Sequence, residues 1–223
     1  MKRFISILFV CLCVVASASA QIGIAVDLGL PSGTKWASCN VGASQPEEYG
    51  DYFAWGETEV KAWYSTAPYR WYVLGDGSGL YNGHYTKYYV SRSSGGFVDG
   101  LSELEAQDDV ASVRWGKEWR IPTTADVEEL VKLCTWEWTK LNDVKGYSVT
   151  GPNGNSIFMP AAGVRVDYDL KYDKIEGHYW TRSLTKESYL GNNIDYLYFD
   201  KRDKAKKNRD RFSGLPVRPV TKD

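Results

Sequence analysis

The stretch PTTADVEELVKLC, from Pro122 to Cys134, carries the strongest local pattern in the chain. A threonine at 123 or 124 follows the proline, as is typical of a helix start, and acidic residues fill the first turns, where they favour the positive end of the helix dipole. Apolar residues then recur at i, i+3, i+4 and i+7, at Val127, Leu130, Val131 and Cys134. The pattern predicts a helix that buries one face and places Cys134 on that face.

The segments on either side of this helix predict an α+β fold. A shorter helix is expected over 108–115, with acids at its start. Upstream, VDLGLPSGTKWASCNVGA at 26–43 holds two short strands around a PSG turn, which predicts a hairpin. Downstream, GPNGN separates two apolar runs and predicts a second hairpin, and further strands are expected at 178–183, 194–199 and 215–220. A hairpin, two helices and then antiparallel strands make an α+β chain.

Residues 44–100 are rich in Gly, Ser, Tyr and Trp and have no sustained periodicity. Such a density of aromatic rings is unlike disorder, so we expect long ordered loops held by aromatic packing. The whole chain has nine Trp and sixteen Tyr. Aromatic rings beyond what a core needs usually serve recognition.

The first twenty residues have the layout of a secretory signal peptide. Lys2 and Arg3 precede an apolar run over 4–15, and small residues over 18–20 stand before Gln21. The run is shorter than the roughly 20 residues that span a bilayer as a helix, and no later segment is apolar for long enough. We therefore expect export to the periplasm, the cell surface or the medium, with a mature chain beginning at Gln21.

A lipid anchor on Cys11 or Cys13 is the competing interpretation of the leader. It is disfavoured because Phe9 and Val10 stand where a lipoprotein signal has small residues. The net charge is −1, so no global basic field predicts binding to nucleic acid. With no linker or repeat to divide it, 21–223 is predicted to be one domain.

Cys39 and Cys134 remain after removal of the leader, and the surroundings of an exported chain allow their oxidation. A disulfide between them is one interpretation, and two buried free thiols are the other. A catalytic cysteine ranks third, because neither His84 nor His178 stands in a nucleophile motif.

Six segments resemble the Fibrobacter succinogenes major paralogous domain family, which is common in exported proteins of Bacteroides-like gut bacteria. They cover nearly the whole mature chain in order: VDLGLPSGTKWASCNVGA at 26–43, EEYGDYFAWGE at 47–57, WGKEWRIPTTADVEEL at 115–130, GPNGNSIFMPAAG at 151–163, YWTRS at 179–183 and LPVRPV at 215–220. The resemblance implies a C-type-lectin-like fold. It also implies a relation to the formylglycine-generating sulfatase-modifying enzymes, but their activity depends on C-terminal cysteines, and this chain has none beyond Cys134.

Metal-dependent sugar binding is not expected. True C-type lectins bind calcium and sugar through Glu-Pro-Asn or Gln-Pro-Asp and Trp-Asn-Asp triplets, which this chain lacks. The nearest oxygen-rich cluster is Asn192, Asn193 and Asp195, and a solvated loop is the favoured interpretation of it. No other cofactor is predicted.

The late strands supply the main candidates for ligand binding. In NNIDYLYFD the alternation puts Leu197 and Phe199 in the core and turns Tyr196 and Tyr198 outward, where their rings suit stacking on a sugar or packing against a protein. Trp180 is expected in the core and Arg182 at the surface. The candidate ligand-binding residues are therefore Arg182, Asn192, Asn193, Tyr196 and Tyr198.

The basic stretch DKRDKAKKNRDRF at 200–212 is interpreted as a solvated loop between the last two strands, in preference to an anion-binding patch. The resemblance gives the stretch a further interest, because in lectin-like folds the surface between the late strands is the usual binding face.

The sequence favours an exported binding module that recognises a glycan, or a host or bacterial surface protein, without metal. An enzyme acting on extracellular polysaccharide is the alternative. Its candidate carboxylates, Glu47 with Glu48, Asp108 with Asp109 and Glu128 with Glu129, are adjacent in sequence, so nothing in their spacing predicts a pair across a cleft. A ligand-binding protein diversified by a retroelement is a third hypothesis.

Overall fold

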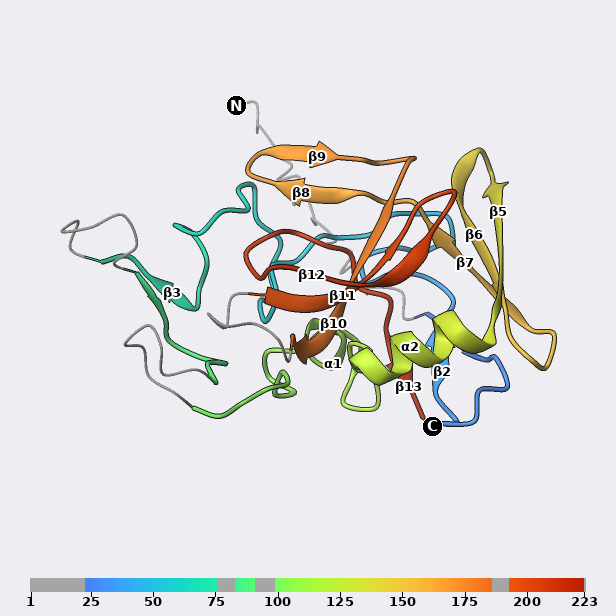
Figure 1. The fold of residues 1–223 in the computed structure, drawn as a ribbon, viewed down its shortest axis with the longest axis horizontal. Helices are drawn as coiled ribbons and strands as arrows, with labels where there is room; N and C mark the ends of the chain where they lie inside the picture. The colour runs from blue at the N-terminus through green and yellow to red at the C-terminus, as the bar shows by residue number, and fades with distance from the viewer. Residues whose placement is uncertain (1–22, 76–82, 91–98, 186–192, 223) are drawn as a thin grey trace, which may run out of the picture.

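The computed structural model describes residues 23–75, 83–90, 99–185 and 193–222. The predicted leader and Asn192 lie outside these ranges. Within them the chain is mostly antiparallel β-sheet with two helices, which is the predicted α+β class (Figure 1). Among the residues that the structure describes, no helix combines the length and the apolarity that a membrane crossing needs.

Helix α2 (Thr124–Leu133) is where the sequence predicts it, and a capping box closes its start. Thr123 Oγ1 accepts a hydrogen bond from the backbone N–H of Asp126 at 3.1 Å, and the Asp126 carboxylate accepts one from the backbone N–H of Thr123 at 2.7 Å. These bonds satisfy donors that a first helical turn leaves unpaired. Val127 and Leu130 are buried on the predicted face, and Cys134 caps the C-terminal end.

Helix α1 (Val110–Trp115) lies within the predicted range 108–115. Its N-cap is Asp109, which is fully buried. The Asp109 carboxylate accepts hydrogen bonds from the backbone N–H groups of Ala111, Ser112 and Ile121. Burial nevertheless raises the pKa of Asp109 above its usual value. This side chain therefore joins the start of α1 to the segment that leads into α2.

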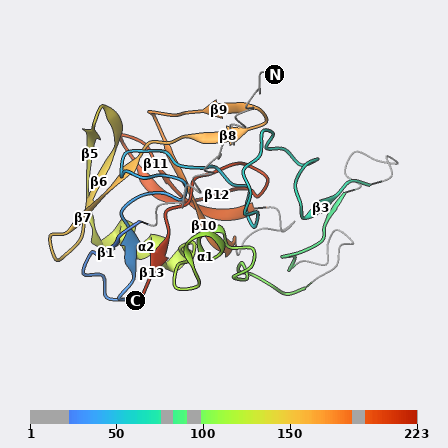
Figure 2. The same ribbon diagram turned by 180° about the vertical axis from the view of Figure 1, so that it is seen from behind.

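The predicted N-terminal hairpin consists of β1 (Ala25–Asp27) and β2 (Lys35–Ala37), and β13 (Val220–Thr221) pairs with the other edge of β2. In Figure 2 the labels of β1 and β13 lie close together, and β2 is the strand between them in this sheet. The strand predicted over 215–220 is shorter in the structure, where β13 covers only Val220 and Thr221. Residues before Val220 follow an irregular path in which Leu215 forms a bridge with Phe53.

A three-stranded sheet follows α2, in the order β5 (Thr135–Leu141), β6 (Val144–Thr150) and β7 (Ser156–Pro160). The hairpin predicted around GPNGN is the β6–β7 connection, in which Gly151 N donates to Asn155 O. Strand β5 was not predicted. It pairs with β6 through a two-residue turn, Asn142 and Asp143, and both residues have positive φ.

The late strands form a second three-stranded sheet, in the order β10 (Gly177–Leu184), β11 (Asn193–Phe199) and β12 (Lys204–Asp210). The first two confirm the predicted strands. The third corrects a prediction, because the basic stretch interpreted as a loop contains β12, which pairs with β11 from Asn193↔Asp210 to Phe199↔Lys204. Hydrogen bonding to a neighbouring strand overrides the low strand propensity of a lysine-rich segment.

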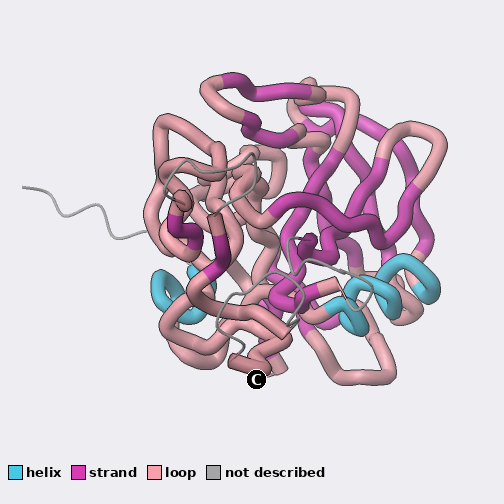
Figure 3. Tube along the Cα trace, turned by 60° about the vertical axis from the view of Figure 1, so that its left-hand side comes forward, coloured by secondary structure: helices cyan, strands magenta, loops and turns pink. Residues whose placement is uncertain are grey.

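Long loops make up much of one side of the molecule, as Figure 3 shows. They contain the two short hairpins β3 (Tyr72–Val73) with β4 (His84–Tyr85), and β8 (Val164–Val166) with β9 (Asp169–Lys171). Buried tyrosines hold the described part of 44–100 in place by donating to backbone carbonyls. Tyr64 bonds to Tyr52 O at 2.6 Å and Tyr69 to Trp55 O at 2.7 Å. The aromatic packing predicted for these loops is confirmed there.

Cys39 and Cys134 are both free and buried, so the disulfide interpretation is corrected in favour of two buried thiols. Cys39 packs in one hydrophobic cluster with Trp55 and Trp180, and Cys134 packs in another with Leu130 and Phe199. Burial raises the pKa of Cys39 above its usual value and that of Cys134 to about 11. The thiols are therefore protonated near neutral pH and pack as small apolar groups.

Candidate functional site

A polar pocket of about 520 Å³ opens where the start of α2 meets the late strands. Figure 1 shows α2 running along these strands. We call this cavity the α2 pocket. Its lining is Ser102, Glu103, Thr123, Thr124, Ala125, Glu128, Ser183, Leu184, Asp195 and Lys206. Eight of these ten side chains carry a hydroxyl, a carboxylate or an ammonium group, so the pocket suits a polar ligand.

Asp195 is the buried carboxylate of the α2 pocket. Thr124 donates its hydroxyl to Oδ2 at 2.8 Å, and Thr185 donates to Oδ1 at 2.8 Å. The ammonium of Lys206, on β12, lies 3.5 Å from Oδ2. A buried carboxylate is tolerated only when it is bonded and paired in this way. Thr124, 71 residues away in the sequence, therefore meets residues of the late strands at this one group.

Arg182 lies beside the α2 pocket but is largely buried, which corrects the prediction that it is exposed. Its guanidinium donates to Leu104 O and lies 3.7 Å from the Glu103 carboxylate and 3.9 Å from that of Asp109. The reason is the loop before α1, which forms a bridge to β10 between Glu103 and Ser183. Arg182 therefore joins that loop to β10, and its contacts are internal.

Asn193 begins β11, and its side-chain amide donates to Asn208 Oδ1 on β12 at 3.0 Å. The Asp195 carboxylate accepts hydrogen bonds from Thr124 and Thr185. The proposed cluster of oxygen ligands is therefore divided, and its third member, Asn192, lies outside the described residues. Among the residues that the structure describes, no group of three or more His, Cys, Asp or Glu side chains is arranged to hold a metal ion.

Tyr196 and Tyr198 are on the face opposite Asp195, as the alternation predicts, but both are buried, with 6% and 8% exposed. The prediction that their rings face solvent is wrong. The ring of Tyr196 stacks on that of His178 with 5.3 Å between the ring centroids, and Lys207 lies over the ring of Tyr198. Leu197 and Phe199, on the other face, are in the core as predicted. Both faces of β11 are covered, so neither tyrosine offers a free ring.

His178 is the centre of this buried aromatic group. Its Nε2 lies 2.8 Å from the Glu176 carboxylate, and its Nδ1 lies 3.3 Å from Arg209 Nη1. Burial, together with the charges of Arg209 and Lys207, lowers the pKa of His178 to about 3. These effects outweigh the nearby carboxylate. A neutral ring that donates from Nε2 and accepts at Nδ1 satisfies both neighbours.

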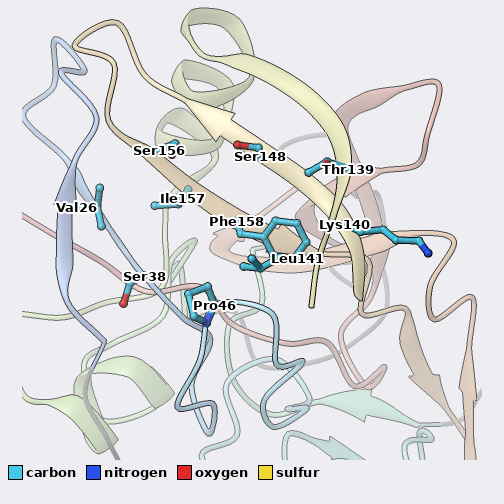
Figure 4. A pocket seen from close by; sticks show the side chains of 10 residues that line it. All are labelled: Val26, Ser38, Pro46, Thr139, Lys140, Leu141, Ser148, Ser156, Ile157 and Phe158. Atoms are coloured by element: carbon cyan, nitrogen blue, oxygen red, sulfur yellow. The ribbon is translucent and has the colours of Figure 1, made fainter. Parts of the chain in front are cut away.

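A second pocket, of about 340 Å³, lies between the N-terminal hairpin and the β5–β6–β7 sheet. Figure 4 shows Val26 facing Ile157 across it, with Pro46 at the near side and Phe158 beside Leu141. Its lining is mostly apolar and hydroxyl groups, and Lys140 is the one charged side chain in it. It has no buried titratable group, so the α2 pocket is the better candidate.

Comparisons of the chain with protein-family models, curated proteins and solved structures found no match. The candidate site therefore depends on its own geometry. That geometry includes residues which the sequence did not single out, namely Thr124, Thr185 and Lys206. The sequence feature that could have indicated this site was the pair of threonines at the start of α2. Nothing local indicates that Thr185 and Lys206 meet the same carboxylate.

Proposed function

We propose that this chain is an exported binding module with the C-type-lectin-like fold of the Fibrobacter succinogenes major paralogous domain family. We further propose that its α2 pocket recognises a hydroxyl-rich ligand, a glycan, without metal. The order of elements supports the fold assignment: a hairpin, two helices and then antiparallel strands. The pocket lies against the late strands, which are the usual binding face in lectin-like folds.

The observation that carries this proposal is the mixture of donors and acceptors around Asp195. Each sugar hydroxyl both donates and accepts, so its site needs groups of both kinds. Glu103 and Glu128 offer acceptors, Lys206 offers a donor, and the hydroxyls of Ser102 and Ser183 can do either. The bonds of Asp195 to Thr124 and Thr185 hold part of this lining in place before a ligand arrives.

The contacts of the Asp195 carboxylate support recognition without metal. Both oxygens of Asp195 already accept hydrogen bonds from threonine hydroxyls, and an ammonium group lies 3.5 Å from one of them. A calcium ion needs six to eight oxygen ligands, with the carboxylate turned towards the ion. At this position Lys206 already supplies the positive charge.

The test is a glycan array with residues 21–223, read with and without EDTA. We expect binding that resists EDTA. Lys206→Met keeps most of the side-chain stem and removes the charge, so it should weaken binding roughly tenfold, the value of one charge-assisted hydrogen bond. Lys201→Met is the matched control, because Lys201 is exposed in the turn between β11 and β12. Binding that EDTA abolishes, or that Lys206→Met leaves intact, contradicts the proposal.

The alternative of a polysaccharide-cleaving enzyme gains one observation from the structure. Glu103, Glu128 and Asp195 come from three segments and line one pocket, whereas the sequence pairs were only neighbours along the chain. Glycoside hydrolysis uses two carboxyl groups that face each other across the bond to be broken. Chromatography of the bound oligosaccharides after long incubation separates the two functions. Shortened products that Glu103→Gln abolishes favour the enzyme, and intact ligand favours the binding module.

A further inference from the structure

Two stacked aromatic rings lie at the β8–β9 hairpin, outside the α2 pocket. Trp63, in the long loops, and Tyr168, in the hairpin turn, stack in parallel with 5.8 Å between ring centroids and 8° between planes. Tyr168 is 68% exposed, although one side of its ring is against Trp63. The other side of the ring therefore faces solvent. We call the two residues the Trp63–Tyr168 platform.

Hydrogen bonds through Asp167 hold both residues of the platform in place. Asp167, the other residue of the turn, has a φ of 55° and exchanges two backbone hydrogen bonds with Tyr64, each of 2.9 Å. Its carboxylate accepts a hydrogen bond from Trp63 Nε1 at 3.4 Å. Tyr64 is itself fully buried. The turn and the indole are thus fixed to the core, and a ligand that binds here does not have to order them.

We propose that the Trp63–Tyr168 platform is a carbohydrate-binding site that stacks on one face of a pyranose ring, as in β-glucans. Such a sugar presents axial C–H bonds on the faces of its ring and hydroxyl groups around its edge. The free face of Tyr168 matches the C–H face, because the ring is apolar and its π-face is electronegative. The neighbouring carboxylate of Asp169 is 71% exposed and can accept from the edge hydroxyls.

The chemistry around the platform favours a sugar over a protein partner. A protein-binding hot spot needs a surrounding ring of contacts that excludes water. Here the free aromatic face is a single tyrosine ring at the tip of a hairpin, and the next residue along the chain is an exposed aspartate. One sugar ring stacked on the ring of Tyr168 needs no more aromatic surface than this single side chain offers. A protein partner is the outcome that the experiment is designed to exclude.

Native affinity electrophoresis tests the site, with residues 21–223 run in gels that contain hydroxyethylcellulose, xyloglucan or a soluble galactan. We expect at least one of these polysaccharides to retard the protein. Tyr168→Ala should weaken that binding roughly tenfold, as the loss of an aromatic contact residue does. Tyr168→Phe should bind as the wild type does, because the ring and not the hydroxyl makes the contact.

Two controls separate this site from others. Tyr172→Ala removes another exposed tyrosine outside the stacked pair, and Lys201→Met changes an exposed lysine in the turn between β11 and β12. Both should retain the retardation. The proposal is overturned if no polysaccharide retards the wild type, if Tyr168→Ala is retarded equally, or if a protein ligand is lost on Tyr168→Ala while polysaccharide binding is absent. Failure of the α2 pocket leaves this result unchanged, because the two sites share no residue.

Discussion

At the scale of single residues, His178 shows how burial sets a protonation state. Its neutral ring fits between the Glu176 carboxylate and Arg209, and its pKa is lowered to about 3 by burial first and then by Arg209 and Lys207. Other groups in contact with it are the rings of Tyr172, Tyr196 and Tyr198. Charging this ring requires the cluster to open.

We therefore expect stability to fall as the pH falls below about 6.5, where histidine in the unfolded chain takes up a proton. Between that pH and about 3 the unfolded state binds more protons, so the free energy of unfolding should fall by up to about 1.4 kcal/mol per pH unit. Urea unfolding at several pH values above the carboxyl range measures this slope. His178→Gln should flatten the slope, and replacing the exposed His84 should not. An unchanged slope in His178→Gln contradicts the prediction.

The cysteines give a second prediction at this scale. Because Cys39 and Cys134 are buried free thiols with raised pKa values, we expect neither to react with a thiol reagent in the folded chain 21–223. Both should react after unfolding in guanidinium without any reductant. A spectrophotometric thiol assay counts them. If the unfolded, unreduced chain shows no free thiol, the two residues are bridged and the structural assignment is wrong.

At the scale of elements, the turn of the β5–β6 hairpin is strained by its residue types. Asn142 and Asp143 have φ values of 47° and 64°, which is the pattern of a type I′ turn, and glycine is favoured at the second position. Asp143→Gly should raise the free energy of unfolding by about 0.5–1 kcal/mol. The ion pair it removes, 3.8 Å from Lys140, is exposed and contributes little.

The β6–β7 turn supplies the opposite change as a control. Gly154 has a φ of 86°, and a Cβ there meets no neighbouring atom, so Gly154→Ala introduces backbone strain without a clash. It should lower the free energy of unfolding by roughly 1 kcal/mol. Urea denaturation of both variants measures the two changes. Destabilisation by Asp143→Gly refutes the assignment of the turn.

The elements also separate what a pattern can predict from what it cannot. The α2 helix and the β6–β7 hairpin were found because their signals, a capped apolar stripe and a glycine-rich turn, are local. The sequence did not predict strand β12, because a segment with Lys204, Lys206 and Lys207 is typical of a solvated loop. Its conformation comes from hydrogen bonds to β11. Of the candidate site, the sequence located the late strands, but it misjudged the exposure of Arg182, Tyr196 and Tyr198.

At the scale of the whole molecule, the two ends of the described chain meet at β2, since β1 pairs with one of its edges and β13 with the other. Arg218 strengthens this junction from a fully buried position. Its guanidinium donates to Asn40 Oδ1 at 2.7 Å and to the carbonyls of Ala37, Ser38 and Phe158, each at 3.0 Å. Residues 217–221 are therefore part of the core.

Removal of residues 216–223 should abolish cooperative folding, because it strips two fully buried valines, Val217 and Val220, and the Arg218 network. The loss of each buried valine and the loss of the Arg218 network cost several kcal/mol each, and together these losses are comparable to the total stability of a domain. Thermal unfolding followed by circular dichroism is the measurement. A chain that ends at Thr221 is the control and should melt like the full mature chain, because Lys222 is exposed. A sigmoidal transition in the longer truncation contradicts the prediction.

The sequence by itself determined the α+β class, the two helices and the threonine cap of the second, the glycine-rich hairpin and the alternation of side chains along β11. Each of these depends on residues within one turn or one strand, where spacing along the chain is spacing in space. Only the tertiary structure decided that both faces of β11 are covered, that Lys206 and Thr124 meet Asp195, and that Tyr168 is exposed. Exposure is a property of what packs against a face, and the covering segments come from distant parts of the chain.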